Sequence, residues 1–343
     1  NRPNKLRLNR DKGDPNQQGA NITQSDQFSD LRSGMFFQRI CFDLPGAGAS
    51  LDPVRSAISN FADEFDIERR HPTYEELADD DGVDAVYVST PHPFHRDNSI
   101  LLLEHGKAVI CEKPFTINAG DAKAVIDVAR QRDVFLMEAM WTRYLPAVVR
   151  ARELIAEGAI GDVRLVQADF GFRAGINPEG RLFSPALAGG ALLDVGIYVV
   201  SFAAMVLGSD PEQIAATAHI GETGVDENTG ILLRYKSGAV ATLSCAVRAS
   251  SPHIARIVGS EGTICVAASW WKGEAATLKA GDREEVIELP LAGNGYNYEA
   301  QEVARCLATG ELESPIMPLD ETVALMRILD EARAQIGLKY PME

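Results

Sequence analysis

Residues 83–114 read VDAVYVSTPHPFHRDNSILLLEHGKAVICEKP and combine two short apolar runs with a helical pattern between them. The first run, Val83–Val88, lies between an Asp-Gly pair and a proline, which is typical of a strand buried on both faces of a parallel sheet. A helix is expected over Asn98–His105 and a second strand over Ala108–Cys111. This order of elements predicts a β-α-β unit.

The same alternation continues on both sides of this segment. A helix over Ala119–Gln131 and a strand over Val134–Glu138 form a third unit, and helices are expected upstream over Pro53–Phe65 and Thr73–Asp79. Residues 50–145 are therefore predicted to form a Rossmann-like, doubly wound α/β domain. Ligands of such sheets bind at the carboxyl ends of the strands, where three polar and aromatic clusters occur: Ser89–His95, Glu112–Pro114 and Glu138–Tyr144.

The pattern changes after a predicted helix at Ala147–Glu157. Alternating segments separated by turns predict strands at Val163–Phe172, Ile214–Ile220, Thr229–Tyr235, Ala239–Ala246, Ala255–Gly259, Gly262–Val266 and Glu285–Leu289. Further helices are predicted at Ala191–Leu207, Tyr298–Thr309 and Leu319–Gln335. Residues 146–343 should thus form a second, α+β domain built on an open, mixed and mostly antiparallel sheet.

Composition narrows the classes of function. The chain has 343 residues, 45% of them hydrophobic and 24% charged, as in an ordinary folded protein of two domains. Its formal net charge of -16 argues against nucleic acid or an anionic membrane as a partner, because both attract clustered Lys and Arg. No run of about 18 or more apolar residues is apparent, and residues 1–30 lack the apolar core of a secretory signal, so a cytoplasmic protein is expected.

Cysteine and histidine spacing predicts neither a disulfide framework nor a metal site. The five cysteines lie far apart without a C-x-x-C pair, and they fit small core residues better. His92 and His95 are three residues apart with no third ligand nearby.

Lys113, at a strand end beside Pro114, could donate a hydrogen bond to a substrate hydroxyl or exchange a proton. A surface ion pair with Glu112 is the competing interpretation. Asp194 and Tyr198 are four residues apart in an apolar helix, so both side chains should share one helix face. They could serve proton transfer and substrate orientation, or they could be a helix N-terminal Asp and a half-buried core Tyr.

Two further segments bear on ligand binding. Trp141, Arg143 and Tyr144 could line a pocket, although packing between domains is slightly favoured. Gly46-Ala47-Gly48 is the one candidate for a dinucleotide-binding loop, but the third glycine of G-x-G-x-x-G is missing. The preceding Phe36–Asp43 is a plausible strand, whereas residues 1–34 show no helix or strand periodicity and are expected to be a solvated tail.

Taken together, these clusters resemble the Gfo/Idh/MocA oxidoreductase family, in particular its branch of dimeric dihydrodiol dehydrogenases and NADP-dependent D-xylose dehydrogenases. The resembling motifs are VDAVYVSTPH at 83–92, EKP at 112–114, EAMWTR at 138–143, GG at 189–190 with Asp194 and Tyr198, GYNYEA at 295–300 and ESPIMPLD at 313–320. The resemblance extends from about Ser50 to the end of the sequence.

The resemblance implies a site, a cofactor and an assembly. Lys113 and Tyr198 would be the catalytic pair, with Asp194 beside them, in hydride transfer between NADP or NAD and a sugar or diol. Residues 146–343 would bind the substrate and join a homodimer through their open sheet. The cofactor would contact Ser50, Thr90, Pro91, His92, His95, Glu112, Lys113, Trp141 and Arg143.

Residues 1–49 depart from the family pattern because no glycine fingerprint follows a first strand. One hypothesis is a misread or out-of-frame stretch in place of the usual beginning, and the other is a real, divergent start that binds the cofactor poorly. A non-catalytic sugar- or nucleotide-sensing protein of the same fold is the rival function, although a sensor has no need of the Lys, Asp and Tyr set.

Overall fold

The computed structural model describes residues 21–30, 35–43, 63 and 69–343, which divide into a unit up to residue 72 and a unit from residue 73 onward. In the first unit, β1 (Asn21–Asp30) pairs antiparallel with β2 (Met35–Asp43), and the register places Phe28 opposite Phe37. The prediction that 21–30 lack regular structure is therefore wrong, because pairing with the next strand, β2, satisfies backbone groups that the pattern within 21–30 does not reveal. The predicted helix at 53–65 lies almost wholly outside the described residues.

In the second unit, three parallel strands form the predicted Rossmann-type sheet. Its order is β3 (Ala85–Val88), β4 (Ala108–Glu112) and β5 (Leu136–Ala139), and its register pairs Val86 with Val109 and Ile110 with Met137. The helices are α2 (Tyr74–Ala78), α3 (His95–Glu104) and α4 (Ala119–Arg132). Asn118 caps α4 by accepting the Asp121 N–H at 2.8 Å.

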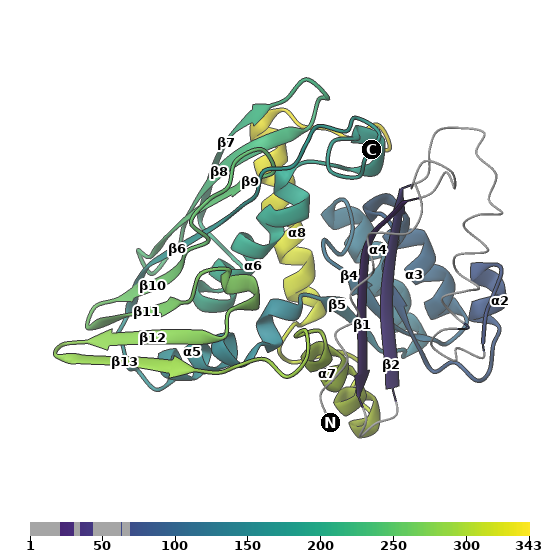
Figure 1. Cartoon of the computed structure of the whole chain (residues 1–343), viewed down its shortest axis with the longest axis horizontal. Helices are drawn as coiled ribbons and strands as arrows, with labels where there is room; N and C mark the ends of the chain where they lie inside the picture. Colours follow the sequence, from purple (N-terminus) through teal and green to yellow (C-terminus); the bar gives the residue numbers. More distant parts are fainter. Residues whose placement is uncertain (1–20, 31–34, 44–62, 64–68) are drawn as a thin grey trace, which may run out of the picture. The chain divides into compact units, whose positions relative to one another are not determined.

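The second sheet has eight strands in the order β13-β12-β11-β10-β6-β9-β8-β7 (Figure 1). The β6–β9 pair is parallel and the other pairs are antiparallel, so the predicted mixed sheet is confirmed. Its strands are β6 (Val163–Gly171), β7 (Gln213–Ile220), β8 (Asp226–Arg234), β9 (Val240–Ala246), β10 (Ala255–Gly259), β11 (Gly262–Val266), β12 (Ala275–Ala280) and β13 (Arg283–Glu288). β12 was not predicted, because its alanines have low strand propensity; the strand is formed by pairing with a neighbour on each side.

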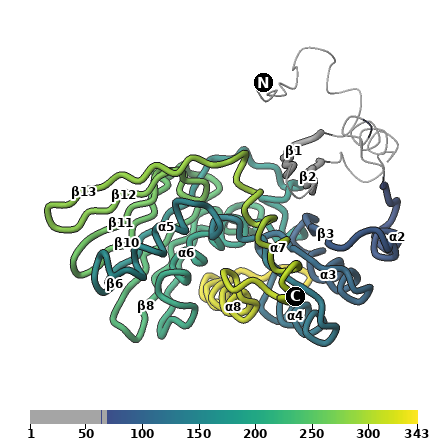
Figure 2. Tube along the Cα trace, turned by 90° about the horizontal axis from the view of Figure 1, so that it is seen from below, coloured from purple at the N-terminus to yellow at the C-terminus, as the bar shows by residue number. Residues whose placement is uncertain are grey.

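Helices cover one face of this sheet. They are α5 (Pro146–Ala156), which contacts β11 and β12, α6 (Ile197–Leu207), which contacts β6 and β9, and α8 (Leu319–Ile336), which contacts β7. Figure 2 shows the chain trace from a second direction, with α7 (Asn297–Thr309) before α8 in the order of colours along the sequence. Because α8 also contacts α4 and β5, it ties the two sheets of this unit together.

The helical segment Pro185–Leu207 is long and apolar enough to cross a membrane by composition, with a window of mean hydropathy 2.0. Glycines and Asp194 interrupt the apolar run, so this segment was not predicted as a membrane span. In the structure 83% of that window is buried, and α6 packs on β6 and β9. Its composition is accounted for by this core position.

Glu138 is an ionisable core group on β5, with no exposed surface. Burial raises the pKa of its carboxyl to about 7, although the Thr322 hydroxyl donates to Oε2 at 2.9 Å and opposes that rise. An unfolded Glu loses its proton as the pH rises through its pKa of about 4.3, whereas Glu138 in the folded protein keeps its proton up to about pH 7. The contribution of this bound proton to the free energy of unfolding is complete below the unfolded pKa of about 4.3 and is lost as the pH rises towards 7.

Glu138→Gln should remove this dependence. Urea denaturation at about pH 5 and pH 8 should show the wild-type protein losing roughly 2–3 kcal/mol more unfolding free energy than the variant over this interval. The exposed Glu153→Gln on α5 is the matched control and should behave as wild type. Equal pH dependence in wild type and Glu138→Gln would contradict the assignment.

Candidate active site

Lys113 follows β4 directly and is buried, with 9% of its surface exposed. Its Nζ donates to the main-chain oxygen of Asp194 at 2.7 Å and lies 3.5 Å from the Asp194 Oδ1. Glu112 is buried too, and accepts the Tyr87 hydroxyl at 2.8 Å and the Lys113 N–H at 3.0 Å. A surface ion pair between Glu112 and Lys113 is thereby excluded, since neither residue is at the surface.

Asp194 lies on η5 (Leu192–Gly196), a π-helical turn that leads into α6. The predicted helix at Ala191–Leu207 was continuous, whereas the structure has a π turn, which often marks a functional site. The start of the turn is pinned by buried Asp226, whose Oδ2 accepts the Leu192 N–H at 2.8 Å. Gly190, at φ +119, is required beside it, because a Cβ there would lie 2.1 Å from the Asp226 Oδ1.

Tyr198 stands one turn further on, with its ring centroid 5.0 Å from the Lys113 Nζ. The Trp141 Nε1 donates to the Tyr198 hydroxyl at 2.9 Å. Trp141 stacks on Tyr296, with ring centroids 4.5 Å apart. Burial raises the pKa of the Tyr198 phenol well above its ordinary value, so the hydroxyl keeps its proton at neutral pH. The structure thus brings together Lys113, Asp194, Tyr198 and Trp141.

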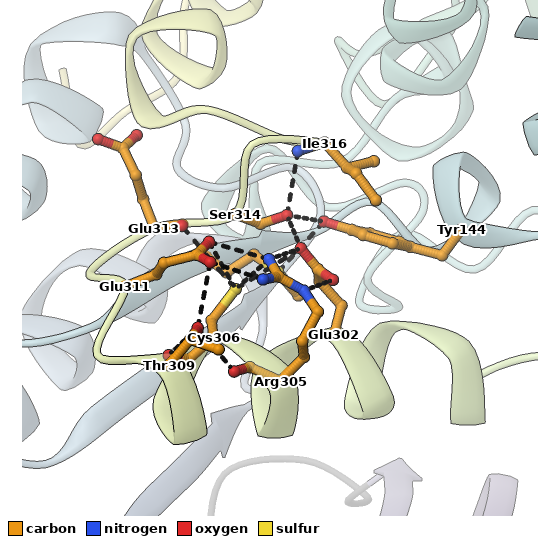
Figure 3. Close-up of polar contacts among 10 residues, drawn as sticks. Tyr144, Glu302, Arg305, Cys306, Thr309, Glu311, Glu313, Ser314 and Ile316 are labelled. Carbon is orange, nitrogen blue, oxygen red and sulfur yellow. Dashed lines mark hydrogen bonds and ion pairs between the residues drawn. The ribbon is translucent and has the colours of Figure 1, made fainter.

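The segment that carries Trp141, η3 (Trp141–Tyr144), is anchored at its far end by a polar network (Figure 3). The Tyr144 hydroxyl lies 3.4 Å from the Ser314 Oγ, and Ser314 donates to the Glu302 Oε1 at 2.6 Å. Arg305 pairs with Glu302 and with Glu311, at 2.8 Å and 2.6 Å. This network fixes α7 against the loop that leads to α8, and so holds η3 in place.

Arg143 is turned away from the strand-end edge. Its guanidinium donates to the Ser201 Oγ at 2.9 Å, the Ser201 main-chain oxygen at 3.0 Å and the Glu321 Oε1 at 2.6 Å. These bonds join η3 to α6 and α8. The structure therefore gives Arg143 a packing role and offers no support for its predicted contact with the cofactor.

The two histidines after β3 serve different contacts. The His92 Nδ1 lies 3.2 Å from the Ala188 oxygen, and burial lowers the pKa of His92 to about 3, so its ring is neutral. His95 bridges the Thr90 and Pro114 oxygens at 2.6 Å and 2.9 Å. Because burial also lowers its pKa, His95 donates to one of them at a time. It connects two strand ends and has no ring nitrogen directed outward.

Thr90 and Pro91 lie at the carboxyl end of β3, where Pro91 precedes the short helix η2 (His92–Phe94). The Thr90 Oγ1 accepts from the Asn98 side chain at 3.2 Å. Ser50 and the Gly46–Gly48 segment lie outside the described residues. Among the described residues, no group of three potential metal ligands occurs.

Two features were not predicted from sequence. Arg181, in the loop between β6 and η4 (Pro185–Leu187), donates to the Asp194 Oδ1 at 2.6 Å. Phe170 lies 5.4 Å from the Tyr198 ring and stacks on Trp271 at 3.5 Å, which extends an aromatic wall from Tyr198. A basic residue thirteen positions before Asp194, within the residues 146–343 expected to bind the substrate, was the available signal for Arg181.

A lysine, a carboxylate and a tyrosine gathered at the carboxyl edge of a Rossmann-type sheet, backed by a second sheet domain, define the class of nicotinamide-dependent oxidoreductases. Comparison with known families agrees. Residues 48–140 match the oxidoreductase family model with an NAD-binding Rossmann fold, and residues 148–265 match the GFO/IDH/MocA C-terminal domain. The chain belongs to the Gfo/Idh/MocA oxidoreductase family.

Its curated relatives include trans-1,2-dihydrobenzene-1,2-diol dehydrogenases. The mouse (Mus musculus) protein is 39% identical over 82% of this chain and 86% of its own length, and the Danio rerio protein is 41% identical with the same coverage. Among solved structures, aldose-aldose oxidoreductase from Caulobacter crescentus, complexed with glycerol, is 26% identical with a TM-score of 0.75 over 82% of this chain and 87% of its own. A 3-ketoreductase from Actinomadura kijaniata, in complex with NADP and TDP-benzene, is 25% identical with a TM-score of 0.72 over 81% of this chain and 86% of its own.

Proposed function

We propose that this protein catalyses reversible hydride transfer between NADP or NAD and a carbon that bears a hydroxyl group in a sugar or a vicinal diol. The observation that carries the proposal is the convergence of Lys113, Asp194 and Tyr198, with the Lys113 Nζ 3.5 Å from the Asp194 Oδ1 and 5.0 Å from the Tyr198 ring centroid. These residues come from the two sheet domains of one compact unit. Relatives named as diol dehydrogenases and an aldose oxidoreductase support the substrate class.

The residues at the strand ends fit a nicotinamide nucleotide. Thr90, Pro91, His92 and Lys113 lie along the carboxyl edge of the parallel sheet, which is where such folds hold their cofactor. The neutral ring of His92 and the ammonium of Lys113 suit a carboxamide and ribose hydroxyls. A nicotinamide cofactor, when bound, supplies or accepts the hydride.

The chain's own groups would handle the proton and orient the substrate. An indole N–H only donates, so Trp141 occupies a lone pair of the Tyr198 oxygen and leaves the phenol proton to point elsewhere. Tyr198 can therefore pass its proton to a substrate carbonyl oxygen, or take one back in the reverse direction. Lys113 would polarise the same oxygen, and Asp194 would accept a neighbouring hydroxyl.

The aromatic wall provides a surface for the rest of the substrate. Phe170 and Trp271 stack beside Tyr198, and the His253 ring meets Trp271 edge-on at 4.5 Å. Flat aromatic faces pack against the ring of a trans-dihydrodiol and also against the C–H face of a sugar such as D-xylose. Both substrates are therefore included in the proposal.

Titration of the purified protein with NADPH and NADH, followed by nicotinamide fluorescence, tests the proposal. Saturable binding is expected, after which D-xylose and trans-dihydrodiols should be oxidised with NADP or NAD. Folded protein that binds neither cofactor would contradict the enzymatic function and favour the sensing role.

The proposed assembly is a homodimer joined through the open face of the eight-stranded sheet. Helices cover the other face, and Leu232 on β8 is 52% exposed. Sedimentation velocity should give the mass of two chains, and Leu232→Glu should shift it towards one chain because a buried carboxylate opposes association. Leu307→Glu, at an exposed position on α7, is the control. A wild-type protein that sediments as a single chain would refute the dimer.

We propose that the protein is located in the cytoplasm. Its support is that Cys111, Cys245, Cys265 and Cys306, the cysteines that the structure describes with their side chains, are all free, as in reducing compartments. Fractionation of cells with an antibody to the protein would test it.

A further inference from the structure

Arg181 reaches the candidate active site from the loop between β6 and η4. Its Nη1 donates to the Asp194 Oδ1 at 2.6 Å, and its side chain is 41% exposed, whereas that of Asp194 is 5% exposed. An ion pair between two exposed side chains contributes little. Here the acceptor, Asp194, is buried, so water screens the pair poorly. Loss of Arg181 would leave the buried carboxylate with one partner fewer.

The Asp194 Oδ1 serves two cations at once. The Lys113 Nζ lies 3.5 Å from this oxygen, and the Lys113 side chain is 10% exposed, whereas that of Arg181 is 41% exposed. Burial alone would raise the pKa of the Asp194 carboxyl, yet Arg181 and then Lys113 hold that pKa well below its usual range. In the part of the chain that the structure describes, no hydrogen bond to Oδ2 is formed, so this is the oxygen available to a substrate hydroxyl.

We propose that Arg181 is a positioning residue for the reaction: it clamps the Asp194 Oδ1 beside Lys113, directs Oδ2 towards the substrate, and ties its loop to the helix that carries Tyr198. This inference rests on the proposed function. Arg181 acts through Asp194 and is not assigned to the reacting atoms. The titratable or charged groups that interact with Asp194 are Lys113, Arg181, His92, Tyr198 and Cys245.

Steady-state kinetics of Arg181→Ala and Arg181→Lys across the pH range would test the role of Arg181. Arg181→Ala should lower kcat/KM by roughly 10- to 100-fold, the loss typical of one hydrogen bond between charged groups. The acid limb of the pH profile of kcat/KM should move to higher pH in this variant, because a proton binds Asp194 more readily without the guanidinium. Added guanidinium ion should restore part of the rate of Arg181→Ala. The kcat/KM of Arg181→Lys should lie between those of wild type and Arg181→Ala.

The control is Arg164→Ala, which removes an exposed arginine that pairs with Asp162 at 2.9 Å on the surface. It should match wild type, and the affinity of Arg181→Ala for NADPH should be unchanged. Unaltered kcat/KM in Arg181→Ala would overturn the proposal, as would a loss of rate with an unshifted acid limb and no rescue, which indicates loop packing alone. A wild-type protein without hydride transfer would instead count against the proposed function.

Discussion

Replacing Lys113 by methionine should lower turnover by roughly 10²- to 10⁴-fold, the range expected when a group that polarises or protonates the reacting oxygen is removed. Methionine has similar length and suits a position that is only 9% exposed, and the buried Asp194 carboxylate keeps its ion pair with Arg181. The fold should therefore survive. The measurement is kcat with the best substrate, together with the NADPH affinity and the urea midpoint of the variant.

A matched control is available in the same domain. Lys107 is also buried, and its Nζ donates to a main-chain oxygen, that of Asp80, at 2.7 Å. Lys107→Met should cost stability with little change in kcat per folded molecule. Lys113→Met with near-normal turnover would end the assignment of Lys113 to the reacting centre.

Tyr198→Phe should reduce turnover by a similar factor, roughly 10²- to 10⁴-fold, because the phenol proton is the one passed to or from the substrate oxygen. The substitution also leaves the Trp141 N–H without its acceptor at 2.9 Å, so a moderate loss of stability of about 1–3 kcal/mol should accompany it. Single-turnover measurements of hydride transfer distinguish the chemical effect from weaker binding.

Two further variants separate the proton-transfer role from packing. Tyr235→Phe removes another buried phenol, whose hydroxyl makes no hydrogen bond within the described part of the chain, and should leave kcat unchanged. Trp141→Phe can keep the stacking on Tyr296 but loses the N–H, so it should slow the reaction by about tenfold, as one hydrogen bond would. Tyr198→Phe with undiminished single-turnover rates would mean that another group moves the proton.

Periodicity predicted most of the fold because the parallel strands and the hairpin strands are locally regular. β10 and β11 have the predicted bounds, and α4 and α7 differ from theirs by one residue at one end. Features set by partners outside the segment itself were missed. β12 depends on its neighbours, and the π-helical turn at Leu192–Gly196 is pinned by Asp226 from another strand.

The candidate site could be predicted only as far as local spacing and family motifs reach. Lys113, Asp194 and Tyr198 were singled out, and the structure brings them together. The bond from Trp141 to Tyr198 joins residues far apart in sequence, and so does the stack of Phe170 on Trp271. Arg143 and His95 were placed at the cofactor, but their polar atoms bind other parts of the protein.

The central claim is hydride transfer at the site formed by Lys113, Asp194 and Tyr198. Its most direct test is incubation of the protein with NADP or NAD and a sugar or trans-dihydrodiol deuterated at the carbinol carbon, followed by mass spectrometry of the cofactor. We predict that deuterium appears on the reduced nicotinamide with wild type and is strongly diminished with Lys113→Met and Tyr198→Phe. Folded wild-type protein that transfers no deuterium from any of these substrates would contradict the account.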